Sequence, residues 1–365
     1  MAEHLYQTIY NDLLEQIESG EYTENDKLPT EHELMRQYGV SRVTAMTALN
    51  MLRDQGLIMR IPRVGSIVRG ATSPIGAHGN IQFVTISASN TIPGLYEAIC
   101  DEAAKFGWSA VMYNTHHSIE AERECLRSIL SRRVSGVICY PLNGEFGYLS
   151  VFEQLKNAGV PLVTVDKRVW LPHGSIPCVT TDNLRATYEL TSWLIEKMGH
   201  RRIAYCCALF TQANARYRFK GYVASLSDHG IEYDPALTDE MERPVMPYRP
   251  LKPDYRNYLT YLMSLSEPPT AVVCECDYVA LALMKSAREL GISIPDQLSV
   301  VGFDNVDICE MLDVPLTTME QNFPEIGRAA VNMLHALIKG EPVEPLRLFD
   351  ARLIERSSVK KIDRS

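Results

Sequence analysis

Ser41, Arg42 and Thr44 stand together at the start of a predicted helix, within the stretch GVSRVTAMTALNMLRDQGLI (39–58). Ser41 can cap the free backbone N–H groups of that helix, and Gly56 is the residue type that ends one. Arg42 and Thr44 fall on the exposed first turn, where capping does not require them. A planar guanidinium there can bind a phosphate or a guanine, and a hydroxyl can bond a base edge. The stretch therefore predicts a nucleic-acid-binding surface.

The arginines around this stretch form a positive patch in an acidic chain. The 365 residues carry a net charge of −9, and residues 1–35 hold one lysine beside nine acidic residues. Residues 36–70 hold one acidic residue and the six arginines Arg36, Arg42, Arg53, Arg60, Arg63 and Arg69. For phosphate binding this local excess matters more than the total charge. A solvated helix face is the alternative interpretation of scattered charge.

The first seventy residues predict three helices and a two-stranded hairpin. Apolar residues at helical spacing give a first helix that ends near residue 20. The second helix begins at a capping box of Thr30 and Glu33 and ends at Gly39, where the third helix follows. Behind it, LIMRI and SIVRG alternate like paired strands. This order predicts a winged helix-turn-helix, with the third helix in the major groove and Arg63 and Gly65 at the wing tip against phosphate or the minor groove.

The segment LPTEHELMRQYGVSRVTAMTALNMLRDQGLI, with RVGSIV behind it, resembles the winged-helix DNA-binding domain of GntR-type transcription regulators over residues 3–69. The resemblance implies DNA contacts on the second helix, the third helix and the wing: His32, Ser41, Arg42, Thr44, Arg63 and Gly65. Many relatives have arginine where His32 and Met46 stand. Base recognition in this chain is therefore expected to use fewer arginines.

Residues 71–80 are rich in Gly, Ser and Pro without periodicity, which predicts a linker behind a DNA-binding domain of residues 1–70. Beyond the linker, short apolar runs alternate with amphipathic stretches of helical length. The runs are IQFVTIS, WSAVMY, SGVICY, PLVTV, RIAYCCAL, TAVVCE and LSVVGF. This alternation predicts βαβ units with parallel sheets, arranged in two lobes. The fold class is thus an α+β winged helix-turn-helix followed by a two-lobed α/β domain.

Polar residues follow these runs at the carboxyl ends of the predicted strands, where open α/β sheets bind ligands. They are Ser87, Ser89, Asn114, Asp166, Lys167, Asp277, Asp304 and Asn305. Sugar hydroxyls both donate and accept hydrogen bonds, so carboxylates and amides beside a lysine or an arginine suit them. Because Asp and Asn are also common turn and cap residues, each position alone has a purely structural interpretation.

The motifs MGHRRIAYCC, NARYRFKGY, PTAVVCECD, IPDQLSVVGFDN and VPLTTMEQNFPEIGRAAVNML resemble the sensor core of LacI-type repressors, which is similar in fold to periplasmic sugar-binding proteins. The resemblance covers residues 81–358 and implies a small ligand enclosed between two lobes. The first lobe would comprise 81–180 and 319–347, and the second 181–318 and 348–365.

The resemblance to LacI-type cores also implies which residues contact the ligand. Asp166 would contribute from the first lobe, and Arg218 and Asp304 from the second. Cys276 precedes Asp277 where the family often has Asn, which removes one expected hydroxyl contact. The aromatic pair that commonly follows the first strand is missing, and Tyr96 or Trp170 is the candidate for a stacking face. With Ser89 and Lys167 from the strand ends, these residues form the expected effector site.

A GntR-type head on a LacI-type core resembles the arabinose-responsive repressors of bacteria. It implies a homodimeric repressor that binds a pseudo-palindromic operator and changes its DNA affinity when a small sugar-like effector, such as a pentose, shifts lobe closure. A nucleobase, a nucleoside or a sugar phosphate is the alternative effector, the last because Lys167, Arg168 and Arg218 are near. A solute-binding transport protein is the alternative class, which the DNA-binding module and the lack of an export signal oppose.

Composition and missing motifs argue against other classes. No apolar run reaches the roughly eighteen residues of a membrane span. Nine cysteines without CxxC spacing indicate reduced, buried thiols and no metal site. The sequence lacks GxxxxGK[ST], HExxH, GxSxG and a strand-linked GxGxxG. We therefore expect a cytoplasmic protein that is not an enzyme, with no cofactor, no metal and no membrane partner.

Overall fold

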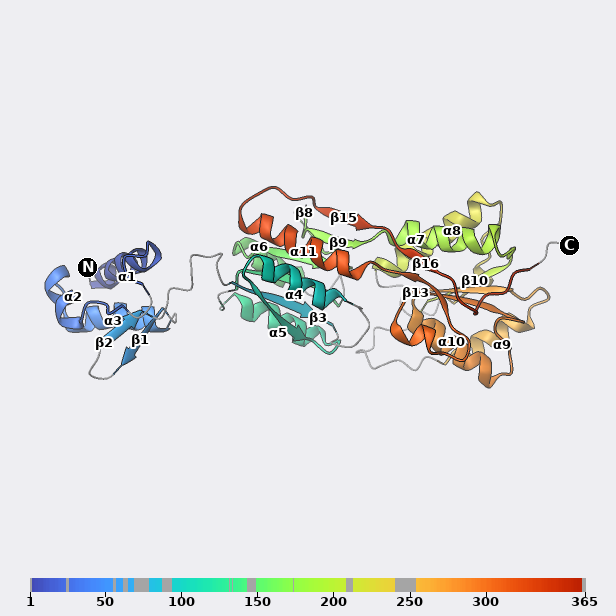
Figure 1. Cartoon of the computed structure of the whole chain (residues 1–365), viewed down its shortest axis with the longest axis horizontal. Coiled ribbons are helices and arrows are strands. Elements are labelled where there is room, and N and C mark those ends of the chain that lie inside the picture. Colours follow the sequence, from blue (N-terminus) through green and yellow to red (C-terminus); the bar gives the residue numbers. More distant parts are fainter. Residues whose placement is uncertain are drawn as a thin grey trace. The chain divides into compact units, whose positions relative to one another are not determined.

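The computed structural model describes residues 2–23, 26–54, 57–61, 65–68, 79–86, 94–130, 132, 134–142, 149–172, 174–207, 213–239 and 254–362. The chain forms two compact units, one built on Met1–Gly79 and the other on Asn80–Lys105 and Ser109–Ser365 (Figure 1). Most of the predicted linker, together with Arg63 and Ser89, lies outside the described residues. Within the described part, no helix is long and apolar enough to cross a membrane.

The first unit contains the three helices and the hairpin that the sequence predicts. They are α1 (Ala2–Glu18), α2 (Glu31–Tyr38), α3 (Arg42–Asp54), β1 (Ile58–Ile61) and β2 (Gly65–Val68). The predicted capping box of Thr30 and Glu33 starts α2, and Gly39 ends it in the left-handed conformation, with φ of 66°. The strands β1 and β2 pair antiparallel, with Ile58 opposite Val68, and form the wing.

The core of the first unit joins one face of each helix to the wing. Its buried residues are Ile9, Leu13, Ile17, Leu28, Leu34, Ala45, Ala48, Leu49, Leu52, Leu57, Ile58 and Val68. Val43 also belongs to the apolar spacing of α3. Val43 is nevertheless 66% exposed, because the small residues Ala45 and Ala48 complete the contact of α3 with the core. An apolar side chain is thus exposed directly beside Arg42.

Two six-stranded sheets form the second unit. The first sheet has the order β15-β9-β6-β5-β3-β4, and its pairings are all parallel. Its strands are β3 (Asn80–Thr85), β4 (Ser109–Asn114), β5 (Gly136–Cys139), β6 (Leu162–Val165), β9 (Cys178–Thr181) and β15 (Leu346–Phe349). Its helices are α4 (Leu95–Lys105), α5 (Ile119–Ile129), α6 (Leu149–Asn157) and α11 (Phe323–Ile338). A short hairpin, β7 (Trp170–Leu171) with β8 (Gly174–Ser175), follows β6.

The second sheet has the order β11-β10-β12-β13-β14-β16, with β16 antiparallel at one edge. Its strands are β10 (Ile203–Cys206), β11 (Thr238–Asp239), β12 (Ala271–Cys274), β13 (Ser299–Asp304), β14 (Thr317–Glu320) and β16 (Arg352–Ile354). Its helices are α7 (Asn183–Glu196), α8 (Ala213–Asp228), α9 (Arg256–Ser264) and α10 (Asp277–Glu289), with the 3-10 turns η1 (Pro235–Leu237) and η2 (Asp307–Glu310). Figure 1 shows α7 and α8 on one side of this sheet and α9 and α10 on the other.

The chain passes between the two sheets three times: from β9 to β10, from β14 to β15 and from β15 to β16. β9 and β14 end in the polar residues Thr181 and Glu320, and Asp350 follows the end of β15. Both sheets are largely parallel, so the carboxyl ends of their strands form one edge of each sheet, where polar side chains can converge.

Candidate functional site

The start of α3 presents three of the predicted DNA contacts. The backbone N–H of Thr44 donates to Ser41 Oγ at 3.3 Å, so Ser41 caps the helix, and the two hydroxyls lie 2.9 Å apart. The Arg42 side chain is 75% exposed. Val43 stands exposed next to it, at a place where an apolar side chain can contact a thymine methyl group. The first turn of α3 therefore offers a guanidinium, hydroxyls and an apolar group to a ligand.

His32 and Gly65, the other described members of this set, lie on α2 and the wing. His32 is exposed in the first turn of α2. Gly65 begins β2 with φ of 119°, and a Cβ at this position would lie 2.8 Å from Cε of Lys27. The positive φ favours glycine here, whereas the flexible end of the Lys27 side chain could move away from a Cβ. The wing thus depends on Gly65 for its backbone path.

Glu31, which the sequence did not predict as a site residue, links α3 to β1 through two arginines. Glu31 Oε2 accepts a hydrogen bond from Nε of Arg42 at 2.8 Å, and its Oε1 accepts one from Arg60. Nη1 of Arg60 donates onward to Oδ1 of Asn50 at 3.1 Å. The hydrogen bonds from Arg42 and Arg60 hold the pKa of Glu31 below its usual value. An acidic residue in the first turn of a helix ordinarily suits the helix dipole, so residue type alone did not reveal these partners.

Arg218 of α8 is the centre of a polar cluster in the second unit. Its Nε donates to Asn183 Oδ1 at 2.7 Å, its Nη1 to the Glu275 carbonyl at 2.6 Å, and its Nη2 to Asp304 Oδ1 at 3.3 Å. The guanidinium also lies 3.7 Å from the centroid of the Phe303 ring. With its side chain only 7% exposed, Arg218 is a buried charge held by a buried partner. Such pairs are costly to break.

Asp304 faces Arg218 from the carboxyl end of β13. Nε2 of Gln321, in the crossover behind β14, donates to the same Oδ1 atom at 2.7 Å. Burial, together with the carboxylates of Asp277 and Asp166, raises the pKa of Asp304 to about 7, although the Arg218 guanidinium opposes this. Asp304 has φ of 119° and Asn305 has φ of 57°. Strained backbone of this kind is characteristic of ligand-binding positions.

Asp166 comes from the other sheet, at the carboxyl end of β6, and also has positive φ, 65°. Nδ2 of Asn214, from α8, donates to its Oδ2 at 2.8 Å, so this bond joins the two sheets. Its Oδ1 is buried and has no hydrogen-bond partner within the described part of the chain. A buried carboxylate oxygen without a donor is costly, and a ligand hydroxyl could supply the missing donor. The Tyr140 hydroxyl is a neighbouring donor: burial, the charges of Asp166 and Asp304, and a hydrogen bond to Asp166 raise the pKa of Tyr140 well above its usual value.

Lys167 and Cys276 lie close to this cluster but differ in what they can offer. The Lys167 ammonium donates to the carbonyl of Leu142 at 3.0 Å and lies 5.3 Å from the centroid of the Tyr140 ring. This side chain is buried and bonded within its own lobe. Cys276 is half-buried at the start of α10, and burial raises the pKa of its thiol, so it presents a neutral, weakly polar group.

Asp277 departs from the expectation of a ligand contact. It is fully buried, its Oδ1 accepts from the Thr318 hydroxyl at 2.6 Å, and its Oδ2 accepts from the Val306 backbone N–H at 2.9 Å. Both carboxylate oxygens therefore hold β14 and the turn behind β13 together. The position at a strand end was correctly predicted, but the side chain turns toward the core. Asp277 supports Asp304 rather than facing a ligand.

The two aromatic candidates have other partners as well. The Tyr96 ring stacks on Phe83 with centroids 5.8 Å apart, and its hydroxyl donates to the Ala110 carbonyl at 3.0 Å. Trp170 is half-exposed, and the Arg168 guanidinium covers its ring at 3.7 Å from the centroid. Tyr96 therefore serves the packing of α4 on β3 and β4.

A cavity of about 640 Å³ adjoins the cluster at the crossovers. Its lining comes from the carboxyl end of β13, from two crossovers and from the start of α4: Gly94, Asp304, Asn305, Glu320, Gln321, Asn322, Pro324, Asp350, Ala351 and Arg352. In the described ranges, no group of three or more His, Cys, Asp or Glu side chains is placed to hold a metal ion. Asp304 is the member of the expected effector set that lines this cavity, and the arginine of the lining is Arg352, whose Nη2 lies 2.7 Å from Glu320 Oε2. Asp166 and Arg218 belong to the neighbouring polar cluster. The carboxylates and amides of the cavity suit a small polar ligand.

Each of the two units matches a known protein family. The model of the bacterial regulatory proteins of the gntR family matches residues 5–68, and that of the periplasmic binding protein-like domain matches residues 194–359. The HTH-type transcriptional repressor CytR of Escherichia coli (strain K12) is 30% identical over 267 residues, 71% of this chain and 73% of that protein. The chain belongs to the bacterial transcriptional repressors with a periplasmic binding protein-like domain.

A second relative and a solved structure are also similar to this repressor. The arabinose metabolism transcriptional repressor of Geobacillus stearothermophilus is 29% identical over 367 residues, 98% of each chain. The solved structure of the transcription regulator CcpA of Lactococcus lactis has the same fold, with a TM-score of 0.67 and 22% identity over 78% of this chain and 100% of that one. The similarity to the arabinose metabolism transcriptional repressor therefore spans both units of this chain.

Proposed function

We propose that the repressor binds operator DNA through α3 and the wing, and that an uncharged sugar of pentose size, held by Asp166, Arg218 and Asp304, changes its affinity for DNA. The observation that carries the effector class is the cluster that Asp166 forms with Asn214, Arg218 and Asp304, in which Asp166 neighbours the Tyr140 hydroxyl and its buried Oδ1 receives no donor at hydrogen-bond geometry within the described residues. A sugar hydroxyl can donate to this oxygen and accept from a neighbouring N–H group. The relative from Geobacillus stearothermophilus, a repressor of arabinose metabolism, supports a pentose.

The charges around the cluster favour a neutral effector over a sugar phosphate. Arg218 already donates to Asn183, Glu275 and Asp304, and the Lys167 ammonium is bonded to Leu142. Arg168, the third candidate, covers Trp170 and donates to Ser175 Oγ at 3.3 Å. A phosphate would have to break these bonds or use the remaining donors, such as Arg168 Nε, which is buried and has no hydrogen-bond partner within the described residues.

A nucleobase favours an uncovered aromatic face, and two rings of the site are covered, whereas Tyr278, close enough to Asp304 for this carboxylate to raise its pKa, is 48% exposed. Arg218 covers Phe303, and Lys167 lies over Tyr140. Hydrogen-bonding groups outnumber apolar surfaces among the remaining neighbours. We therefore infer a polyhydroxylated effector, with a nucleoside, which also carries sugar hydroxyls, as the second candidate.

The crossovers provide a route from the effector to the rest of the second unit. We assign the first lobe to residues 80–181 with 323–349, and the second to 183–320 with 352–362. The bond between Asp166 and Asn214 joins these lobes, and Gln321 links Asp304 to the Thr181 hydroxyl in another crossover. An effector that takes over these bonds stabilises one lobe arrangement relative to the other, and this differential binding shifts the equilibrium.

The carboxylates serve as fixed hydrogen-bond acceptors in this proposal, and no catalytic step is assigned to them. Asp304 and Asp166 are each held by side chains whose removal would leave them unpaired. A solute-binding transport protein would share the two-lobed fold, but the winged helix-turn-helix of the first unit gives this chain a DNA-binding function.

Effector affinity should depend on pH near neutrality. A hydroxyl that donates to ionised Asp304 favours the charged form, so affinity should rise about tenfold from about pH 6 to about pH 8 if the pKa is about 7. Without effector, folded Asp304 binds its proton more tightly than unfolded Asp304, so this group's contribution to stability falls as the pH rises from about 4 to about 7. Calorimetric titration at several pH values measures the affinity.

The control for this pH dependence is Asp304→Asn, whose affinity should be lower and flat across the same range. His117 is a neighbour of Lys167, and burial lowers its pKa to about 4, so it stays neutral throughout. A pH dependence of equal size in Asp304→Asn would contradict the assigned role of this carboxylate.

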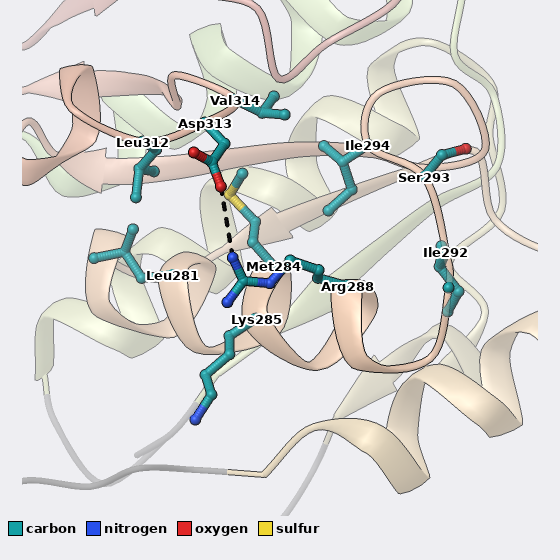
Figure 2. A pocket seen from close by; sticks show the side chains of 11 residues that line it. Leu281, Met284, Lys285, Arg288, Ile292, Ser293, Ile294, Leu312, Asp313 and Val314 are labelled. Atoms are coloured by element: carbon teal, nitrogen blue, oxygen red, sulfur yellow. Dashed lines mark ion pairs between the residues drawn. The ribbon is translucent and has the colours of Figure 1, made fainter.

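We further propose that the repressor is a homodimer and that the outer face of α10 and η2 lies in the contact. A cavity of about 440 Å³ opens there, lined by Leu281, Met284, Lys285, Arg288, Gly291, Ile292, Ser293, Ile294, Leu312, Asp313 and Val314 (Figure 2). Met311 beside it is 75% exposed. Arg288 and Asp313 form an exposed ion pair at 3.5 Å, and opposite charges on one patch can pair across a two-fold axis.

Met311→Asp should dissociate the dimer, because a charge would be buried without a partner at the contact. Sedimentation should then give the monomer mass of 41.1 kDa, while the circular dichroism spectrum stays unchanged. Leu130→Asp, at an exposed apolar residue behind α5, should leave the mass of the dimer intact. A dimer that survives Met311→Asp, or that Leu130→Asp disrupts equally, would place the contact elsewhere.

The effector class is tested by thermal-shift screening of the full chain against pentoses, hexoses, nucleosides and sugar phosphates. We expect a pentose to raise the melting temperature most, since a ligand stabilises the state that it binds. A larger shift with a phosphorylated sugar would overturn the argument from the engaged basic groups.

A further inference from the structure

Glu31 of α2 brings together two arginines from different elements of the first unit. Arg42 reaches its Oε2 from the first turn of α3, and Arg60 reaches its Oε1 from β1 of the wing. The Glu31 side chain is partly buried, at 17% exposed, and its two carboxylate oxygens each bond one of these arginines. One carboxylate thereby fixes two guanidiniums relative to each other.

The atoms used by the two arginines differ, and the difference separates their roles. Among the described residues, Arg42 bonds Glu31 through Nε, which leaves its two terminal NH₂ groups for a guanine or a phosphate. Arg60 uses both of its terminal nitrogens, one on Glu31 and one on Asn50. Arg60 therefore balances the charge of Glu31, while the two terminal NH₂ groups of Arg42 remain available to donate to a base pair.

We propose that Glu31 is a positioning residue for operator recognition: it aims the terminal NH₂ groups of Arg42 and limits the attraction of this arginine to phosphates of any sequence. The inference rests on the proposed DNA contact of Arg42. A free, flexible arginine can follow any phosphate, which adds affinity without discrimination. An arginine held at Nε presents its fork in one direction, so it favours the base pair that matches this direction. Glu31 thus contributes specificity at some cost in total affinity.

The test compares Glu31→Gln with wild type on two duplexes, one selected from a random pool by the wild-type protein and one of random sequence. We expect operator affinity to fall and random-duplex affinity to rise, so that their ratio drops about tenfold or more, the size of one bidentate base contact. The salt slope on the random duplex should steepen by about 0.9, as one further phosphate contact forms.

Two further variants separate positioning from charge and from folding. Glu31→Asp keeps the charge but is too short to reach both arginines, so operator affinity should fall without the gain on random duplex. Glu15→Gln removes an exposed carboxylate of α1 and should leave the ratio unchanged. In an Arg42→Ala background, Glu31→Gln should no longer lower operator affinity, whereas a merely structural role would add its loss to that of Arg42→Ala.

The outcomes also distinguish this inference from the proposed function. If Arg42→Ala binds the operator like wild type, the DNA contact itself is wrong. If Arg42→Ala weakens operator binding while Glu31→Gln leaves the ratio unchanged, only the positioning role of Glu31 is overturned. If Glu31→Gln fails to fold by circular dichroism, the comparison of Glu31→Asp with wild type decides, and an unchanged operator affinity in Glu31→Asp contradicts the proposal.

Discussion

Arg218→Met should lower effector affinity at least about a hundredfold while leaving operator binding intact. The substitution keeps an aliphatic chain over Phe303 but removes the donors to Asn183, Glu275 and Asp304. Removing one partner of a buried ion pair costs about 3–5 kcal/mol, because the other charge stays buried and unpaired. Part of this cost lowers the free energy of unfolding. The remainder weakens effector binding, because the acceptors that Arg218 holds in place lose their arrangement. Calorimetry and chemical denaturation measure the two parts.

The matched control for Arg218→Met is Arg216→Met, an exposed position two residues earlier on α8. The same substitution there should leave effector affinity within about twofold of wild type. Operator binding should persist in both variants, since the first unit has a core of its own. Equal losses of effector affinity in the two variants would indicate damage to α8 rather than to the site.

Arg42→Ala should weaken operator binding by about 1–3 kcal/mol, which corresponds to roughly tenfold to a hundredfold. The melting temperature should barely change, because the side chain is exposed and Ser41 still caps α3. A base contact would be lost mainly on the operator, whereas a phosphate contact would be lost on every duplex and would reduce the salt slope by about 0.9. Titration of operator and random duplex at two salt concentrations separates these cases.

The control for Arg42→Ala is Arg36→Ala, which removes an exposed arginine from the last turn of α2. It should weaken binding to both duplexes slightly and equally, through the change in net charge. If Arg42→Ala behaves like Arg36→Ala, or like wild type, Arg42 merely solvates the helix start.

The strands were predictable where a continuous apolar run in the sequence coincides with complete burial in the sheet. The runs IQFVTIS, SGVICY, PLVTV and LSVVGF became the buried strands β3, β5, β6 and β13, because continuous apolar residues suit a parallel sheet covered on both faces. The crossover strands β15 and β16 contain Arg347 and Arg352 and are only partly buried. Such strands carry neither alternation nor an apolar run, so their pairing depends on the neighbours that the fold provides.

The candidate site was predictable to the extent that strand ends mark it. Asp166 and Asp304 follow buried strands and converge as expected from parallel sheets. Asn183, Asn214 and Gln321 were missed because they come from helix starts and a crossover, where amides commonly serve as caps. Asp277 shows the opposite error, since a strand-end position does not determine whether a carboxylate faces a ligand or the core. Glu31 was missed because its two arginine partners are distant in sequence.

The most direct test of the account is the dissociation constant of the full chain for its selected operator, measured by fluorescence anisotropy with and without the effector found by thermal shift. In wild type, saturating effector should change this constant by about tenfold or more, the size of an ordinary allosteric coupling. In Arg218→Met the same concentration should change it by less than about twofold, while the constant without effector matches wild type. An equal effector response in both proteins, or a wild-type constant that no bound ligand alters, would contradict the claim that this cluster controls DNA binding.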